Sequence, residues 1–255
     1  MIHFCYDRTL EGFLTAVFEV YEHKAVDSRI CAAENFTEGL FGYSIQVVTD
    51  RAKAARVWKG LQQRLTAKGL DYLACASLSE LPAAEDTMLA FIRHVFAQTQ
   101  NVEDDFSHPA VLDITRIHKM VRRERHRMKA FVRFQATKDG LFYAGIEPDF
   151  NVLPLIRQHF QRRYADQRWI IYDLKRKYGL YYDLQTVNTI ELDFAPETQA
   201  GKDISIAFDD REELFQQLWK DYFASVNIAS RKNMVLHLRH VPKRYWKWLP
   251  EKKLP

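Results

Sequence analysis

The chain has 255 residues, of which 47% are hydrophobic and 13% aromatic, and its formal net charge is +4. A chain of this length and apolar content can bury a sizeable core, which excludes global disorder, and 9 glycines and 8 prolines exclude collagen-like and low-complexity classes. No apolar run approaches the length of a membrane span and the first residues show no secretory signal, so we expect a cytoplasmic protein without membrane contact.

The chain begins with a predicted strand and helix. IHFCYD, at residues 2–7, combines β-branched and aromatic residues and ends at a turn-prone aspartate. Thr9 is placed to cap a helix whose apolar residues, from Leu10 to Tyr21, follow at three- and four-residue spacing. IQVVT, at residues 45–49, predicts a second strand.

Two more helices complete the predicted N-terminal part. Asp50 is expected to cap the first, with Gly69 just past its end, and residues 70–78 form the second. LPAAED follows, and Pro82 marks the best domain boundary in the sequence. We therefore expect a small α/β domain over residues 1–84 and a second domain over residues 85–255.

The second domain begins with helical patterns. A buried helix is predicted from Glu85, and another from about residue 109 to residue 129. FVRFQ (131–135) and LFYAGIE (141–147) then flank Asp139-Gly140, a strong signal for a tight turn between two strands.

A helix over residues 152–164 separates this hairpin from further strands. RWIIYDL (168–174) and LYYDLQT (180–186) flank a turn near Gly179, and another strand is predicted at 188–194. This order predicts an antiparallel sheet with packed helices, so the fold class of the chain is α+β. Late helices are predicted at residues 212–225 and 231–240.

Charge divides the chain unevenly. Residues 1–110 carry 10 Lys and Arg and 15 Asp and Glu, a net charge of −5, whereas residues 111–255 carry 27 and 18, a net charge of +9. The basic part is the candidate for binding a polyanion such as nucleic acid.

Recognisable catalytic and metal motifs are missing from the sequence. There is no phosphate-binding glycine loop, no HExxH, no nucleophile elbow and no deaminase signature. His237 and His240 lie three residues apart but without a carboxylate or cysteine beside them, and the three cysteines show no zinc-binding spacing. We expect reduced thiols, no metal and no cofactor.

A basic segment at residues 118–134 is the most informative feature. It holds a single acid among seven bases, and such density repels itself unless an anion neutralises it. Phosphate binding is therefore predicted; the alternative is a solvated face balanced by the acidic N-terminal domain. The seven bases are Lys119, Arg122, Arg123, Arg125, Arg127, Lys129 and Arg133.

The single acid in this segment, Glu124, falls in the apolar stripe of the helix, between Val121 and Met128. A carboxylate on a packed face must be paired or protonated. It is either a site acid, facing His126 or a base of the hairpin, or a structural ion pair with a neighbouring arginine. We favour the structural role, because structural networks perturb carboxylates as readily as active sites do.

A second pair of carboxylates, Glu147 and Asp149, lies at the end of a predicted strand and near a helix start. They could bind a metal or perform acid–base chemistry. The favoured interpretation is that Asp149 caps the helix and Glu147 interacts with its dipole. Four arginines, Arg157, Arg162, Arg163 and Arg168, add to the basic field of this half.

The C-terminal tail interleaves aromatic and basic residues. This composition suits a surface that stacks nucleobases and neutralises phosphates, above all those of single-stranded or damaged DNA. The alternative is a segment that docks its tryptophans into the core. The residues concerned are Lys243, Arg244, Tyr245, Trp246, Lys247 and Trp248.

Four segments together resemble a bacterial family of DNA-metabolism and DNA-repair proteins: YDRTLEGFLTAVFEVYEHK, RRERHRMKAFVRF, LFYAGIEPDFNVLPLIRQHFQRRYADQRWIIYD and HVPKRYWKWLPEK. From about Glu85 to its end the chain resembles domain of unknown function 4130. The resemblance implies a neighbouring radical-SAM protein or a uracil-DNA-glycosylase-like partner, and it supplies no catalytic residues. The chain lacks a three-cysteine iron–sulfur motif and is not itself the radical enzyme.

These features together predict a DNA-binding accessory protein that assists a repair enzyme and docks it through the acidic N-terminal domain. A rival hypothesis is an enzyme in its own right, a nuclease or base-processing activity using Glu124, Glu147 or Asp149. A third is a structural subunit without affinity for nucleic acid.

Overall fold

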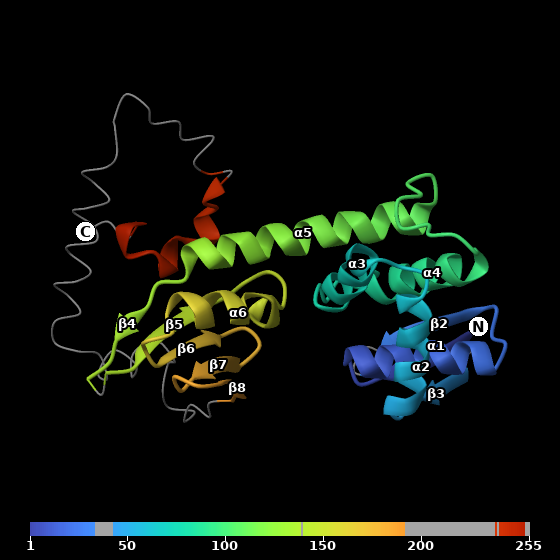
Figure 1. Ribbon diagram of the computed structural model, residues 1–255, viewed down its shortest axis with the longest axis horizontal. Helices are drawn as coiled ribbons and strands as arrows, with labels where there is room; N and C mark the ends of the chain where they lie inside the picture. Colours follow the sequence, from blue (N-terminus) through green and yellow to red (C-terminus); the bar gives the residue numbers. More distant parts are fainter. Residues whose placement is uncertain (34–42, 139, 192–237, 239, 253–255) are drawn as a thin grey trace. The chain divides into compact units, whose positions relative to one another are not determined.

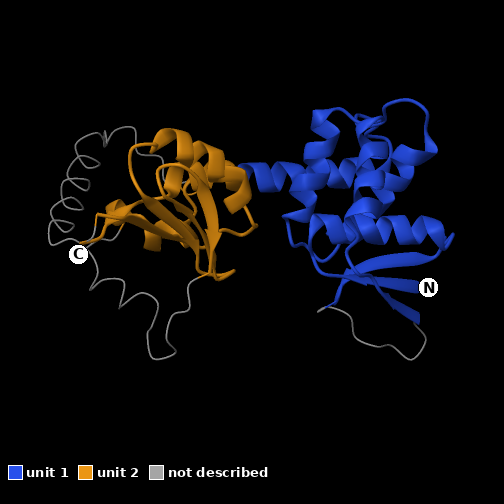
Figure 2. Ribbon diagram, turned by 60° about the horizontal axis from the view of Figure 1, so that its bottom comes forward, with its two compact units in different colours: residues 1–123 blue, residues 124–255 orange. Residues whose placement is uncertain are grey.

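A computed structural model describes residues 1–33, 43–138, 140–191, 238 and 240–252. The chain forms two compact units, Met1–Arg123 and Glu124–Pro255, shown in different colours in Figure 2. We call them the N-terminal and the C-terminal unit and describe each by itself.

The N-terminal unit contains a parallel sheet with the strand order β2-β1-β3. Its central strand is connected to β2 through helix α1, capped as expected by the Thr9 hydroxyl, which accepts from the Gly12 N–H at 2.9 Å. The sequence did not predict β2, because its five residues carry no clear alternation. The elements are β1 (Ile2–Tyr6), α1 (Leu10–Glu22), β2 (Ser28–Ala32) and β3 (Tyr43–Gln46).

Three further helices belong to the same unit: α2 (Arg51–Gln62), α3 (Ala67–Ser77) and α4 (Ala84–Ala97). Asp50 caps α2 as predicted, accepting from the N–H groups of Ala52 and Lys53. Gly69 does not follow the end of α2 but lies buried inside α3, whose cap is Thr66. The hydroxyl of Thr66 starts a new helix four residues after α2 ends, which explains the error.

Helix α5 (Pro109–Phe131) begins in the N-terminal unit and ends in the C-terminal one, and Figure 1 shows it as one continuous helix. Its buried stripe includes Val111, Ile114, Val121 and Met128. The compact units divide inside this helix, between Arg123 and Glu124, whereas the sequence placed a domain boundary after residue 84. Residues 84–97 form α4, which packs against α3 and β2.

The C-terminal unit contains a five-stranded sheet with the order β4-β5-β6-β7-β8, and helix α6 packs against it. The sheet is antiparallel as predicted except for the pair β5 and β6, which is parallel with Phe142 opposite Trp169. A helical crossover between two neighbouring strands returns the chain to the same end of the sheet and makes them parallel. The elements are β4 (Gln135–Ala136), β5 (Phe142–Ile146), α6 (Leu153–Arg163), β6 (Trp169–Asp173), β7 (Tyr178–Tyr182) and β8 (Val187–Ile190).

Two local predictions in this unit are wrong. The first strand of the hairpin is shorter than expected, because α5 continues through Phe131 and leaves only Gln135–Ala136 to pair with β5. Gly179 lies inside β7 rather than in the turn before it, where Lys177 has a φ of 58°. A glycine is required there by close packing, since a Cβ atom would lie 2.8 Å from the Tyr172 ring and 2.9 Å from the Ile171 carbonyl oxygen.

Aromatic side chains form the core between α6 and the sheet. The Phe160 ring lies 6.3 Å from Trp169, which in turn lies 5.5 Å from Tyr182, and Phe134 closes the cluster at 5.8 Å from Phe160. This core fixes α6 on the sheet and so determines which of its side chains remain at the surface.

The chain ends in two 3-10 helices, η3 (Lys243–Trp248) and η4 (Pro250–Lys252). The helix predicted at 212–225, and the one at 231–240 with His237, lie outside the described residues apart from residues 238 and 240. No helix in the described ranges is long and apolar enough to cross a membrane.

Candidate nucleic-acid interface

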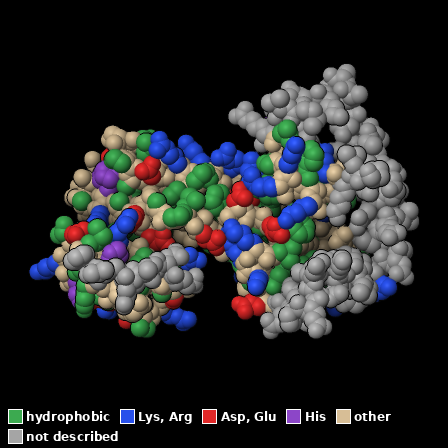
Figure 3. Space-filling model, turned by 180° about the vertical axis from the view of Figure 1, so that it is seen from behind, with side chains coloured by type: hydrophobic (Ala, Val, Ile, Leu, Met, Phe, Trp, Pro, Cys, Tyr) green, Lys and Arg blue, Asp and Glu red, His purple; other side chains and the backbone are tan. Residues whose placement is uncertain are grey.

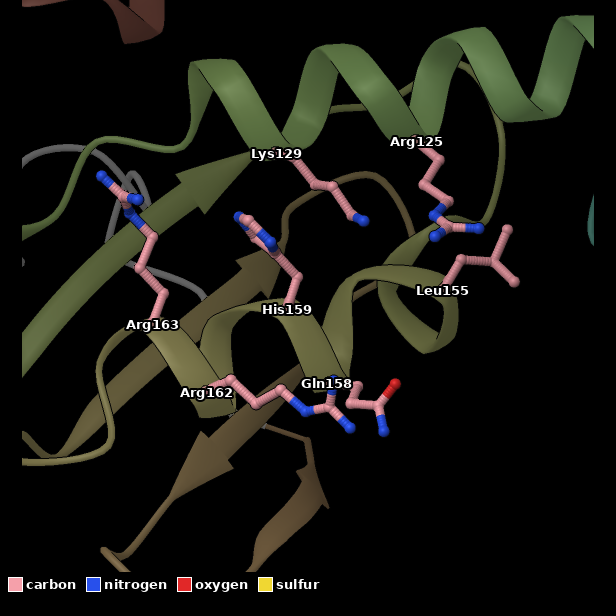
Figure 4. A pocket seen from close by; sticks show the side chains of 7 residues that line it. All are labelled: Arg125, Lys129, Leu155, Gln158, His159, Arg162 and Arg163. Carbon is pink, nitrogen blue, oxygen red and sulfur yellow. The ribbon is translucent and has the colours of Figure 1, made fainter.

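An open cavity of about 490 Å³ lies between α5 and α6. Arg125 and Lys129, one turn apart on α5, point toward α6, and His159 of α6 points back toward them (Figure 4). The α6 residues follow at helical spacing, so one face of the helix supplies them all. The cavity is lined by Arg125, Lys129, Leu155, Gln158, His159, Arg162 and Arg163.

The lining of this cavity, which we call the basic pocket, is cationic. Two residues of α5 and two of α6 supply Lys and Arg side chains, and no acidic side chain is among the seven lining residues. Burial lowers the pKa of His159 below its usual 6.5, and the charges of Lys129, Arg163 and Arg125 lower it further. An anion in the pocket would relieve this mutual repulsion, and phosphate fits the guanidinium groups bidentately.

The other bases of the predicted phosphate-binding segment do not line this pocket. Lys119, Arg122 and Arg123 lie exposed in the N-terminal unit, where Arg122 is 3.5 Å from a carboxylate oxygen of Asp71. In the C-terminal unit, Arg127 lies 3.6 Å from Glu124, and Arg133 donates to Glu251 at 2.8 Å. Three bases of the segment therefore lie beside acids, two face the pocket, and the exposed Lys119 and Arg123 do neither in the contacts described.

Glu124 lies at the centre of a second cluster. Its side chain is buried, and one oxygen accepts from the Asp149 backbone N–H at 3.0 Å and from the Tyr245 hydroxyl. The other oxygen lies 3.6 Å from both Arg127 and Arg244. The carboxylate thus joins α5 to the loop before α6 and to the C-terminal tail, while His126, the other candidate in this segment, is exposed.

Glu147 and Asp149 are also paired with bases of the tail. Arg244 contacts the Asp149 carboxylate at 2.5 Å, and Lys247 contacts Glu147. Asp149 does not cap α6, because the Asp149 carboxylate is held by Arg244 instead. The residue before the first residue of α6 is Val152, which makes no side-chain capping bond. Among the described residues, no group of three metal-binding side chains includes Glu124, Glu147 or Asp149.

Arg176 holds the loop that carries Glu147 and Asp149. Its guanidinium donates to the carbonyl oxygens of Pro148 and Asp149, at 3.1 and 3.2 Å, and to the buried carboxylate of Asp173 at 2.8 Å. Asp173 also accepts from two backbone N–H groups of the following turn. The loop is therefore held rigidly, which suits a structural role for its carboxylates.

The tail is anchored by one fully buried aromatic residue, and its other aromatic residues are half-buried. Tyr245 is 1% exposed, and burial and its hydrogen bond to Glu124 raise the pKa of its hydroxyl. Trp246 and Trp248 are half-buried: the Trp246 N–H donates to the Val241 carbonyl, and the Trp248 ring packs near Gly145. Lys243, the first residue of η3, is exposed.

Cations lie over the rings of the tail. The Arg244 guanidinium is 4.5 Å from the centre of the Tyr245 ring, the Lys247 ammonium 4.9 Å from that of Trp248, and the Lys252 ammonium 5.7 Å from that of Trp246. Tyr245 thus docks the tail, and cations lie beside its rings, while the binding of nucleobases to these rings stays a prediction.

The tail and the basic pocket use adjoining faces of α5. Glu124 and Phe131 contact Tyr245 of the tail, with the Phe131 ring 5.4 Å from that of Tyr245, and Arg127 lies between them on the helix, 3.6 Å from Glu124. Arg125 is one residue after Glu124 and Lys129 is one turn after Arg125, so both lie about 100–140° around the helix from Glu124.

The sequence model of one protein family matches residues 82–251, which is more than half of the chain. The chain belongs to the DUF4130 family, a domain of unknown function. The basic pocket, the Glu124 cluster and the tail through Glu251 all lie inside the residues that match, and the resemblance of the C-terminal part to this domain is thereby confirmed. Searches of curated proteins and of solved structures find no match.

Sequence reasoning named Arg125, Lys129, Arg162 and Arg163 but not the pocket that they share, and it missed His159. The signal was present, because residues 155, 158, 159, 162 and 163 repeat at three- and four-residue spacing. The spacing could not predict that this face of α6 lies against α5, because that depends on how both helices pack.

Proposed function

We propose that the DUF4130 domain binds the phosphate backbone of nucleic acid at the basic pocket and serves as an accessory protein in DNA metabolism or repair. The observation that carries the proposal is the convergence of bases from two helices on one open cavity without an acid in its lining. Backbone phosphates supply most of the affinity of proteins that bind DNA without sequence preference.

Four bases elsewhere in the same unit have acidic partners. Arg133, Arg176, Arg244 and Lys247 each contact a carboxylate. Charges that are paired in this way are used for folding, whereas the pocket gathers positive charge around a cavity whose lining contains no acid. This contrast favours Arg125, Lys129, Arg162 and Arg163 as the binding residues.

The tail supports a preference for single-stranded or damaged DNA. Its half-buried indoles lie beside the ammonium groups of Lys247 and Lys252, an arrangement suited to unpaired bases that can stack. Bases in an intact duplex are already stacked on one another and offer only their edges.

The partner in this proposal is a radical-SAM or uracil-DNA-glycosylase-like enzyme, on the basis of the resemblance to DNA-repair proteins. The C-terminal unit would hold the DNA, and the acidic N-terminal region would dock the enzyme. The rival hypothesis of an enzyme in its own right has less support, because Glu124, Glu147 and Asp149 are each neutralised by arginine or lysine.

The test is a titration of a fluorescent single-stranded oligonucleotide at several salt concentrations. Arg125→Ala/Lys129→Ala should weaken binding and lower the salt slope by about one to two units, because two phosphate contacts are lost. The matched control is Lys138→Ala/Lys175→Ala, which removes the same charge from exposed positions of the same unit outside the pocket.

Equal losses for the two double variants would mean that only net charge matters and would contradict a phosphate site in the pocket. Unchanged binding in the Arg125→Ala/Lys129→Ala variant would contradict it as well. Metal-dependent cleavage of the oligonucleotide, abolished by Asp149→Asn, would instead favour the rival enzyme hypothesis.

A further inference from the structure

Three side chains with different metal-binding atoms meet in the N-terminal unit. Asp71 and Cys75 lie one turn apart on α3, and His118 reaches them from α5. The His118 Nε2 atom is 2.8 Å from one oxygen of Asp71, and the Cys75 sulfur is 3.8 Å from the other. All three ligand atoms lie within 4.8 Å of one another.

These distances fit the geometry of a tetrahedral site. With zinc bound at about 2.0–2.3 Å, two ligand atoms of a tetrahedron lie roughly 3.3–3.6 Å apart. The observed 2.8 and 3.8 Å, each to a different oxygen of Asp71, lie on either side of that separation, and all three ligand atoms lie within 4.8 Å of one another, so side-chain rotation that draws them together would place them around one cation. We propose that Asp71, Cys75 and His118 bind a divalent zinc-like cation, with water as a fourth ligand.

The chemistry of the three ligands selects this class of cation. A thiolate and an imidazole are typical ligands of zinc and related transition metals, and a carboxylate completes many such sets, whereas magnesium and calcium prefer oxygen alone. Asp71 and Cys75 at positions i and i+4 of one helix necessarily share a face, which holds two of the ligands in place before a metal arrives.

The surroundings provide both shielding and access. Cys75 is fully buried, and the ring of Tyr72 lies edge-on to that of His118 at 4.9 Å, which restrains the imidazole. The side chains of His118 and Asp71 are 19% and 35% exposed. The cation and its water can therefore approach from the side of Asp71.

Without a cation, the Asp71 carboxylate is stabilised by His118 and by Arg122, whose guanidinium lies 3.5 Å away. The Arg122 side chain is 46% exposed, so it can turn toward solvent when a cation takes over its role. Binding would then exchange an ion pair for coordination, and the Cys75 thiol would release its proton to solvent as the sulfur–metal bond forms.

This proposal is independent of nucleic-acid binding, because the three residues lie in the other unit and none of them lines the basic pocket. The test uses the full chain, reduced and stripped of metal, and titrates it with Co²⁺ as a spectroscopic probe and then with Zn²⁺. We expect one equivalent of Co²⁺ to give a sulfur-to-metal charge-transfer band, and Zn²⁺ to displace it.

Variants assign the ligands. Cys75→Ala should abolish the charge-transfer band and His118→Gln should weaken binding at least tenfold, while Cys31→Ser should change neither. Cys31 is the control because its sulfur lies 3.5 Å from that of Cys5 and could form a competing thiol site. Far-ultraviolet circular dichroism and the metal-free melting temperature establish that each variant folds. The variant Asp71→Asn, which keeps a hydrogen-bond partner for His118, gives a second measurement of how the loss of a ligand affects Co²⁺ binding.

Two results would overturn the proposal. One is a wild-type protein that binds Co²⁺ without a charge-transfer band or does not bind it at all. The other is a band that survives in Cys75→Ala and disappears in Cys31→Ser, which would assign the cation to the Cys5 and Cys31 thiols instead.

Discussion

In the N-terminal unit, several bases at the surface lie beside acids: Lys53 contacts both Glu19 and Glu22, Lys68 contacts Asp104, and Arg29 contacts Asp86. In the C-terminal unit, four bases share one cavity without an acid in its lining, and the principal acid, Glu124, is buried. Figure 3 shows the first pattern as red and blue side chains interspersed on the visible face of the N-terminal unit.

The contrast separates two uses of the same residue types. Exposed ion pairs contribute little to stability, about 0–1 kcal/mol each, and keep a surface near neutrality. Bases that gather around one cavity repel one another unless an anion binds there. Such a gathering supports the proposed role of these bases in binding.

The largest expected effect concerns the buried acid. Glu124→Gln removes the negative charge between Arg127 and Arg244 while keeping an acceptor for the Tyr245 hydroxyl, and it should lower the free energy of unfolding by about 1–3 kcal/mol. Denaturant titration measures this change. Asp86→Asn, which breaks the exposed pair with Arg29, is the matched control and should cost at most about 1 kcal/mol.

A Glu124→Gln variant with wild-type stability that fails in a repair assay would reverse the assignment and make Glu124 a site acid. Equal losses of stability for Glu124→Gln and Asp86→Asn would show that burial of the acid does not distinguish the two units.

An effect of similar size is expected for an indole of the tail. Trp248→Ala should reduce the preference for single-stranded over duplex DNA by about 1–3 kcal/mol, the value of one stacked base. Trp58, a half-buried indole on α2 of the N-terminal unit, provides the control, and Trp58→Ala should leave the preference unchanged. Fluorescence anisotropy with both forms of DNA measures the difference.

Intrinsic tryptophan fluorescence gives an independent readout, because stacking on a base should quench it in proportion to binding. Binding without any change of fluorescence, with an unaltered strand preference in Trp248→Ala, would leave the tail a docking segment held by Tyr245.

The comparison of the units also shows what the sequence could supply. The caps at Thr9 and Asp50 were predictable, because a capping side chain bonds to the backbone two or three residues away. The burial of Glu124 was predictable from helical periodicity alone. Such features depend on neighbouring residues, and the local sequence determines them.

Features that depend on distant residues were not accessible in the same way. Strand β2 pairs with β1 across the intervening α1, and the parallel pairing of β5 with β6 depends on how α6 crosses the sheet. The grouping of Asp71, Cys75 and His118 required α3 to meet α5. Asp71 and Cys75 share a face because they lie four residues apart on one helix, but a histidine far along the chain has no fixed position relative to them until the helices pack.

A smaller effect is expected from adding an acid to the basic pocket. Gln158→Glu places a carboxylate one turn before Arg162, where it can pair with that guanidinium and repel phosphate. Affinity for single-stranded DNA should fall about fivefold, which corresponds to about 1 kcal/mol. Gln161→Glu makes the same change of charge on the same helix outside the pocket lining and should have a clearly smaller effect; equal effects would contradict the site.

The smallest expected effect is a dependence of binding on pH through His159. Burial and the neighbouring charges of Lys129, Arg163 and Arg125 lower the pKa of His159 below 6.5, so its imidazole is neutral at pH 7 in the absence of DNA. A bound phosphate stabilises the imidazolium and raises this pKa, so binding should take up a proton and become tighter as the pH falls from about 8 to about 5.5. The effect on folding has the opposite direction: the unfolded chain binds the proton more readily, so stability is lost as the pH falls below 6.5 toward the folded pKa.

Oligonucleotide titrations across this range should show the tightening in wild type and a flatter profile in His159→Gln. The variant His126→Gln, which changes an exposed histidine outside the pocket, should match wild type. Calorimetry in two buffers of different ionisation enthalpy counts the protons directly, and a wild-type protein that binds DNA without proton uptake would place the phosphate away from His159.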